Sequence, residues 1–169
     1  MLIHRSRVFD LYSNNVSSRR APFEYVTHRG SCATLLLDPS DSIGLIPHDR
    51  PAIGKTIYEL PAGTLDYEAS IESIMVNELK EETGIVLREN QLQRLTSFYT
   101  SPGYTSELLT LFLAYVTKEQ RKRADSLRWF ALPELLELIR KGDICDMKTV
   151  AAVTSFQTVF WKAPENEKY

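Results

Sequence analysis

The sequence predicts an α/β or α+β protein, in which a mixed β-sheet packs between helices and an N-terminal arm of β-strands precedes it. Short apolar runs bounded by turn residues occupy the first sixty residues and return between residues 95 and 130. One central segment instead spaces its apolar residues three and four positions apart, as a helix does. The order of strands, one helix, more strands and two closing helices favours layers around one sheet.

The first part of the chain predicts several short strands, separated by turns rich in Asp, Asn, Ser, Pro and Gly. We expect residues 1–29 to form the arm and residues 30–165 to form the main domain. The expected strands lie within 3–29 (one or two strands) and at 32–37, 43–47 and 57–60, the last stopped by Pro61-Ala62-Gly63.

The segment 70–83 predicts an amphipathic helix. Ile71, Met75 and Leu79 form its apolar face at helical spacing, and Gly84 is a natural C-terminal stop. The later elements expected are strands at 95–99, 108–116 and 128–130 and helices at 133–141 and 149–159.

Composition excludes several classes of protein. A formal net charge of −2 gives no basis for general nucleic-acid binding, which needs a basic face. No apolar run approaches the roughly 18–20 residues that span a bilayer, and the charged first residues are not followed by the apolar stretch of a secretory signal. Cys32 and Cys145 stand far apart and predict neither a zinc site nor a disulfide framework, so we expect a cytoplasmic protein.

Three carboxylates stand out on the predicted helix. Glu78, Glu81 and Glu82 occupy positions i, i+3 and i+4, which share one helix face with Cβ atoms about 5–6 Å apart. Mg²⁺ prefers hard oxygen ligands and is held by a few carboxylates together with substrate phosphates. The same spacing is also common on a plain solvated helix face, so it does not by itself define a metal site.

The surrounding pattern resembles the Nudix box. In that pattern a Gly stands fifteen residues before the first Glu of a Glu-apolar-x-Glu-Glu-x-Gly-apolar run, as Gly63 stands before Glu78 here. Ala69 departs from the pattern where it has a Glu, and Asn77 departs where it has an Arg. The resemblance implies an α/β/α sandwich around a mixed sheet, and a Mg²⁺ or Mn²⁺ ion held by Glu78, Glu81 and Glu82.

Segments outside the box resemble the ADP-ribose and ADP-sugar pyrophosphatase branch of that family. Residues 59–63 (Glu-Leu-Pro-Ala-Gly) are similar to the entry to its box, and residues 101–107 (Ser-Pro-Gly-Tyr-Thr-Ser-Glu) to a loop downstream of it. The resemblance implies that the Ala62 carbonyl joins the metal ligands and that the arm builds a homodimer. It also implies a general base at Glu107 and a diphosphate contact from Arg50. Phe23 either stacks on the nucleobase or simply packs on an edge strand, and Tyr104 and Gly63 are further candidate substrate contacts.

The function expected from the resemblance is Mg²⁺-dependent hydrolysis of a nucleoside diphosphate sugar, such as ADP-ribose or another ADP-sugar, to AMP and a sugar phosphate. The base that takes the proton from water is either Glu107 or a box glutamate, with Glu78 and Glu81 as candidates. Arg50 either holds the diphosphate or serves as an ion-pair partner within the fold. Two alternatives remain open, namely a nucleotide-sugar sensor with little turnover and an interaction domain with a merely acidic helix.

Overall fold

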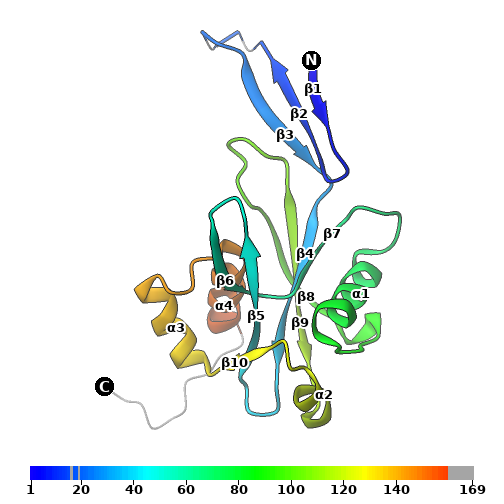
Figure 1. Cartoon of the computed structure of the whole chain (residues 1–169), viewed down its shortest axis with the longest axis vertical. Coiled ribbons are helices and arrows are strands. Elements are labelled where there is room, and N and C mark those ends of the chain that lie inside the picture. The colour runs from blue at the N-terminus through cyan, green and yellow to red at the C-terminus, as the bar shows by residue number, and fades with distance from the viewer. Residues whose placement is uncertain (16, 19, 160–169) are drawn as a thin grey trace.

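The computed structural model describes residues 1–15, 17–18 and 20–159, so residues 160–165 of the expected main domain lie outside the described part. A mixed sheet of seven strands forms the centre of the molecule, and a separate antiparallel sheet of three strands forms the arm at one end of it (Figure 1). The arm strands are β1 (Leu2–Arg5), β2 (Phe9–Asn14) and β3 (Phe23–His28). The central strands are β4 (Ser31–Leu37), β5 (Ile43–Arg50), β6 (Lys55–Glu59), β7 (Ala62–Thr64), β8 (Gln93–Tyr99), β9 (Leu108–Tyr115) and β10 (Arg128–Phe130).

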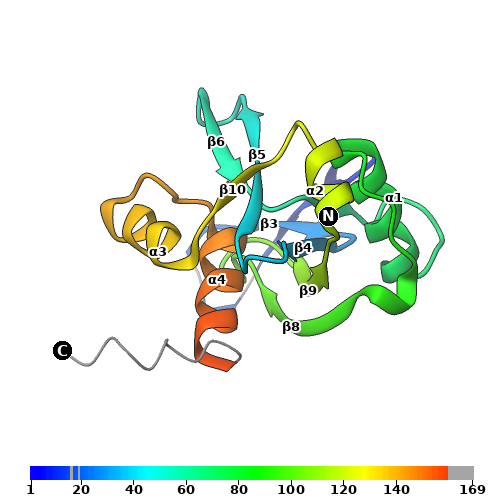
Figure 2. The ribbon, with the colours of Figure 1, turned by 90° about the horizontal axis from the view of Figure 1, so that it is seen from below.

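Helices cover both faces of the central sheet, which confirms the predicted sandwich (Figure 2). In the order β10-β5-β4-β9-β8, strands β4 and β9 run parallel side by side, and all seven residues of β4 are buried. Ala33, Leu35 and Leu37 of β4 enter the apolar cluster under α3 (Leu132–Lys141) and α4 (Met147–Val159). Cys32 and Leu36 enter the opposite cluster under α1 (Ile71–Thr83). Because successive side chains of a strand point to opposite faces of the sheet, β4 contributes to the apolar core on each face.

The helix α1 forms where the apolar spacing predicts it. The Ser70 hydroxyl caps its N-terminus by accepting a hydrogen bond from the Ser73 N–H at 3.0 Å. Gly84 ends the helix in the left-handed conformation with φ of 71°, as expected from its position. Met75 and Leu79 are fully buried and fix which face of α1 packs on the sheet, leaving the glutamates on another face.

The arm has three strands, whereas the sequence predicted one or two. All four residues of β1 are exposed, so no alternation of apolar and polar residues marks this strand in the sequence. The arm is joined to the main body by the loop after β8, since the Val26 N–H donates to the Tyr104 carbonyl at 2.7 Å and the Ser106 N–H donates to the Val26 carbonyl at 3.0 Å.

Some further elements differ from the sequence prediction. Residues Ala62–Thr64, expected to end a strand, form β7 and pair with β4. The short helix α2 (Lys118–Arg123) was not predicted, because it is almost wholly charged and buries no side chain. The last helix begins at Met147 rather than residue 149. No helix in the described part of the chain is long and apolar enough to span a membrane.

Candidate functional site

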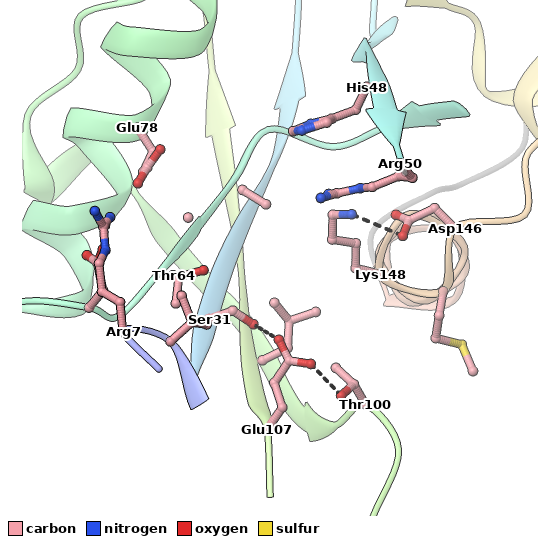
Figure 3. A pocket seen from close by; sticks show the side chains of 16 residues that line it. Arg7, Ser31, His48, Arg50, Thr64, Glu78, Thr100, Glu107, Asp146 and Lys148 are labelled. Atoms are coloured by element: carbon pink, nitrogen blue, oxygen red, sulfur yellow. Dashed lines mark hydrogen bonds and ion pairs between the residues drawn. The ribbon is translucent and has the colours of Figure 1, made fainter. Parts of the chain in front are cut away.

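One cavity of about 500 Å³ opens between α1, β7 and the start of α4, with residues of the arm at its edge. Figure 3 shows that its polar side chains come from segments distant in the sequence. Glu78 and Arg7 lie on the α1 side, Glu107 lies below, and Arg50 and Lys148 lie with Asp146 on the α4 side. The polar residues lining it are Arg7, Ser31, His48, Arg50, Thr64, Asp66, Glu78, Thr100, Glu107, Asp146 and Lys148.

Gly63 lets β7 approach Glu78 closely. A Cβ atom at Gly63 would lie 2.3 Å from Glu78 Cγ and 2.8 Å from its Cδ, so only glycine fits against this side chain. Burial raises the pKa of Glu78, and the charges of Glu81 and Asp66 add to the effect. Beneath the strand, the Cys32 thiol donates to the Gly63 carbonyl with a 3.7 Å separation, and burial raises the Cys32 pKa to about 12, which keeps this thiol protonated.

Glu82 contacts the same strand one residue earlier. Its carboxylate accepts a hydrogen bond from the Ala62 N–H at 3.1 Å. Burial raises the pKa of Glu82 to about 7, with a further contribution from the charge of Glu78 and against the lowering influence of the Ala62 hydrogen bond. Glu81 is exposed and lines a neighbouring hollow together with Glu78. The three glutamates therefore share one side of α1, as their spacing predicts.

This group of carboxylates fits a hard divalent cation by its chemistry. Burial and mutual repulsion raise the pKa values of Glu78 and Glu82, and a cation among these oxygens would relieve the repulsion. Within the described residues, no three acidic, histidine or cysteine side chains converge on one point. The fit therefore rests on donor type and charge rather than on a preformed ligand cage.

The opposite wall carries a network of ion pairs centred on the buried carboxylate of Glu59. Arg50 donates to this carboxylate twice, from Nε at 2.7 Å and from Nη2 at 2.5 Å, and Lys148 donates to it as well. Lys148 also contacts Asp146 Oδ1 at 3.0 Å. Burial alone would raise the pKa of Glu59, but the hydrogen bonds and charges of Arg50 and Lys148 together lower it. Arg50 thus serves as an ion-pair partner within the fold while it lines the cavity.

The network reaches into the helix α4 through Asp146. Its second oxygen accepts from the Thr149 N–H at 3.0 Å and from the Thr149 hydroxyl at 2.6 Å, which caps the helix. The same hydroxyl accepts from the Leu60 N–H at 3.0 Å, so α4 is tied to the segment that leads into β7. The cationic wall is thereby fixed relative to the glutamates of α1.

Glu107 lies at the base of the cavity, immediately before β9. One carboxylate oxygen accepts from the Ser31 hydroxyl and the other from the Thr100 hydroxyl, both at 2.7 Å (Figure 3). Its side chain is 26% exposed, so it is accessible from the cavity. The structure brings Glu107, Glu78 and Arg50 to one cavity, although they are distant in the sequence.

Phe23 and Tyr104 do not line this cavity. They line a second hollow of about 270 Å³, between the arm and the loop after β8. Phe23 stacks on Tyr25, and Tyr25 stacks on Tyr12, with ring centroids 5.8 and 5.5 Å apart. The structure therefore brings these two predicted residues together, but in an aromatic hollow separate from the glutamates.

Several cavity residues were not singled out from the sequence. Arg7, in the turn between β1 and β2, forms an ion pair with Asp66, which follows β7. Ser31 and Thr100 contact the Glu107 carboxylate through their hydroxyls, and isolated hydroxyls carry no recognisable sequence pattern. Lys148 lies beside Asp146, which caps α4, and only its charge could have suggested a place in the site.

Comparisons with known proteins agree with this geometry. A model of the NUDIX domain matches residues 27–152. An ADP-ribose pyrophosphatase of Bacillus subtilis is 31% identical over 92% of this chain and 88% of its own. A methanol dehydrogenase activator of Bacillus methanolicus is 32% identical over 85% of this chain and 79% of its own. A GDP-mannose pyrophosphatase of Escherichia coli is 30% identical over 89% of this chain and 88% of its own. The chain therefore belongs to the Nudix pyrophosphatase family.

Proposed function

We propose that this protein hydrolyses the diphosphate bond of a nucleoside diphosphate sugar in a Mg²⁺-dependent reaction. ADP-ribose or another ADP-sugar is the proposed substrate, and AMP and a sugar phosphate are the products. The observation that carries the proposal is the facing arrangement in one cavity of Glu78, from the glutamate side of α1, and the cations Arg50 and Lys148. The relative named ADP-ribose pyrophosphatase supports the adenine nucleotide, and the relative named GDP-mannose pyrophosphatase makes GDP-sugars the first alternative to test.

In this mechanism the walls of the cavity have different tasks. Glu78, Glu81, Glu82 and the Ala62 carbonyl would hold a Mg²⁺ or Mn²⁺ ion, which would supply positive charge against the diphosphate and orient the attacking water. Arg50 and Lys148, which stay fixed by Glu59, bind the phosphate oxygens. Gly63, whose missing side chain leaves room for Glu78, lines the cavity as a proposed substrate contact. Glu107 takes the proton from water, with Glu78 and Glu81 as the alternative bases.

The arm supplies the remaining part of the proposal. Residues 1–29 form a dimerisation element and residues 30–165 the catalytic domain. Phe23 and Tyr104 offer aromatic faces, on which a nucleobase stacks. Stacking accepts any base, so this hollow by itself does not select adenine.

A panel of nucleotide sugars tests the proposal. ADP-ribose, ADP-glucose, GDP-mannose and UDP-glucose are incubated with the protein and Mg²⁺, and release of the nucleoside monophosphate is followed. We expect release to need the metal, to be fastest with an ADP-sugar, and to be lost in Glu82→Gln. Equal rates for the wild type and this variant would contradict the proposed role of the box.

A second candidate function is a nucleotide-sugar sensor with little or no turnover. It is favoured by the two departures from the box pattern, at Ala69 and Asn77. Where the pattern has an Arg, Asn77 carries no charge, and its side chain donates a 3.3 Å hydrogen bond to the Tyr67 hydroxyl. Tight binding of ADP-ribose without product after long incubation would support the sensor. A thermal unfolding curve unchanged by Mg²⁺ would instead favour an interaction domain with an acidic helix.

A further inference from the structure

We propose that Ser31 and Thr100 are positioning residues that hold the Glu107 carboxylate in a single orientation for its role in the reaction. The inference rests on the proposed function and deepens it. Neither hydroxyl contacts the glutamates of α1 in any hydrogen bond of the described residues, and each makes one side-chain hydrogen bond, to Glu107 (Figure 3). We call these two residues the hydroxyl clamp.

Ser31 belongs to a regular strand, and Thr100 directly follows one. Ser31 is the first residue of β4, where it is paired with Thr64 on one side and with Leu109 on the other, and it is only 8% exposed. Thr100 directly follows β8 and opposes Glu107, and its N–H donates to the Glu107 carbonyl at 3.2 Å. The donors are therefore fixed by sheet pairing, as a precisely oriented functional group requires.

The clamp also suits the chemistry of a carboxylate that accepts a proton. An ionised carboxylate only accepts hydrogen bonds and has about four acceptor positions, so one hydroxyl on each oxygen leaves acceptor capacity on both. That remaining capacity is available to a group in the cavity that Glu107 lines. A carboxylate without these donors would rotate among several side-chain conformations, and the fraction correctly placed would fall.

The nearby imidazole does not replace the clamp. His28 Nδ1 lies 4.0 Å from Glu107 Oε1, beyond hydrogen-bond distance. The same nitrogen accepts a hydrogen bond from the Gly30 N–H at 3.0 Å, and a nitrogen that accepts carries no proton to donate. Among the described residues, the direct side-chain donors to the Glu107 carboxylate are thus Ser31 and Thr100.

Isosteric variants separate the hydroxyl from the packing of its side chain. Thr100→Val removes the donor and keeps the shape, Thr100→Ser keeps the donor and loses a methyl group, and Ser31→Ala removes the other donor. Thr110→Val is the matched control, because the Thr110 hydroxyl bonds to that of Ser97 at 3.1 Å on the same pair of strands, away from the cavity. Melting temperatures of all four proteins show whether each remains folded.

Steady-state hydrolysis of ADP-ribose with Mg²⁺, or of GDP-mannose if that is turned over faster, gives kcat and KM for each variant. We expect Thr100→Val and Ser31→Ala to lower kcat by between about 5- and 100-fold. We expect KM to stay within about twofold, since the clamp does not bind substrate. Thr100→Ser and Thr110→Val should keep the wild-type kcat. In a Glu107→Gln background, Thr100→Val should cause no further loss.

The outcomes separate the inference from the proposed function. Equal rates for Thr100→Val and Thr100→Ser would overturn the clamp, as would a further loss in the Glu107→Gln background. Full hydrolysis by Ser31→Ala combined with Thr100→Val would overturn it while leaving the proposed hydrolysis intact. No hydrolysis of any nucleotide sugar by the wild-type protein would overturn the proposed function, and the clamp with it.

Discussion

Gly63 decides how closely a strand approaches the carboxylates of α1. The missing side chain makes room for the stem of Glu78, and the neighbouring Ala62 N–H holds Glu82. At this scale the Nudix spacing has a direct physical meaning, because the glycine and the first glutamate of the box occupy adjoining space. The residue type at position 63 is fixed by contact distance rather than by backbone conformation.

Gly63→Ala should lower kcat/KM for the proposed substrate by at least about 100-fold, because the new Cβ displaces Glu78 from the cavity. The rate of nucleotide sugar hydrolysis checks this expectation. Gly103→Ala is the control for stability, since a Cβ there meets no atom within 4 Å, and its melting temperature should match the wild type. A fully active Gly63→Ala variant would contradict the close packing of β7 on α1.

Thr34 offers a second prediction at this scale. It is fully buried in β4, and its hydroxyl has no hydrogen-bond partner among the described residues. Valine has the same shape without the unpaired hydroxyl, so Thr34→Val should raise the free energy of unfolding by about 1 kcal/mol. Urea denaturation measures the change. Thr110→Val, which breaks a bonded hydroxyl pair, should change stability in the opposite direction, and a less stable Thr34→Val protein would refute the idea.

At the scale of whole elements, Glu59 joins three of them. It ends β6, pairs with Arg50 at the end of β5 and receives Lys148 from α4. Its side chain is 2% exposed, so its charge is stabilised almost wholly by these two partners. This buried carboxylate keeps the cationic wall of the cavity in place, which makes it a structural requirement for the proposed site.

Glu59→Gln should lower the free energy of unfolding by about 3 kcal/mol at neutral pH, because it removes the buried charge that pairs with Arg50 and with the largely buried Lys148. The pKa of Glu59 is lowered in the folded protein, so its stabilisation is present above the ordinary value near 4.5. It is lost as the pH falls below that value through the folded pKa. Unfolding measured between pH 7 and pH 3 should therefore show an acid-dependent loss in the wild type that is smaller in Glu59→Gln. Identical pH profiles would be inconsistent with this network.

Helices and strands that residues close in the sequence specify were predicted well. Those that form only by pairing with a strand distant in the sequence were not. The spacing of Met75 and Leu79 and the stop at Gly84 predicted α1, because a helix is held by contacts within a few residues. The strand β7 escaped prediction, since Pro61 and Gly63 indicate a turn and only pairing with β4 makes these residues a strand. In the candidate site, the spacing of the box glutamates predicted that they share one side of α1, whereas Ser31 meets Glu107 across 76 positions of sequence.

At the scale of the whole molecule, the arm adds a surface that the central sandwich lacks. Its strands leave apolar side chains exposed, with Ile3 at 47% and Phe9 at 40%. Arg7 of the same hairpin reaches the edge of the main cavity, and Phe23 faces the aromatic hollow. The arm therefore links the surface proposed for dimerisation to both hollows proposed for the substrate.

We expect the protein to be a dimer in solution and Ile3→Asp combined with Phe9→Asp to make it a monomer, because burying two carboxylates in an apolar interface costs several kcal/mol. Light scattering after size-exclusion chromatography gives the mass. Val86→Asp is the control, since Val86 is 64% exposed and follows α1 on the main body, away from the arm, and this variant should remain a dimer. A monomeric wild type, or a double variant that stays dimeric, would contradict the proposed role of the arm in dimerisation. A monomer with unchanged KM for ADP-ribose would further show that each cavity is complete within one chain.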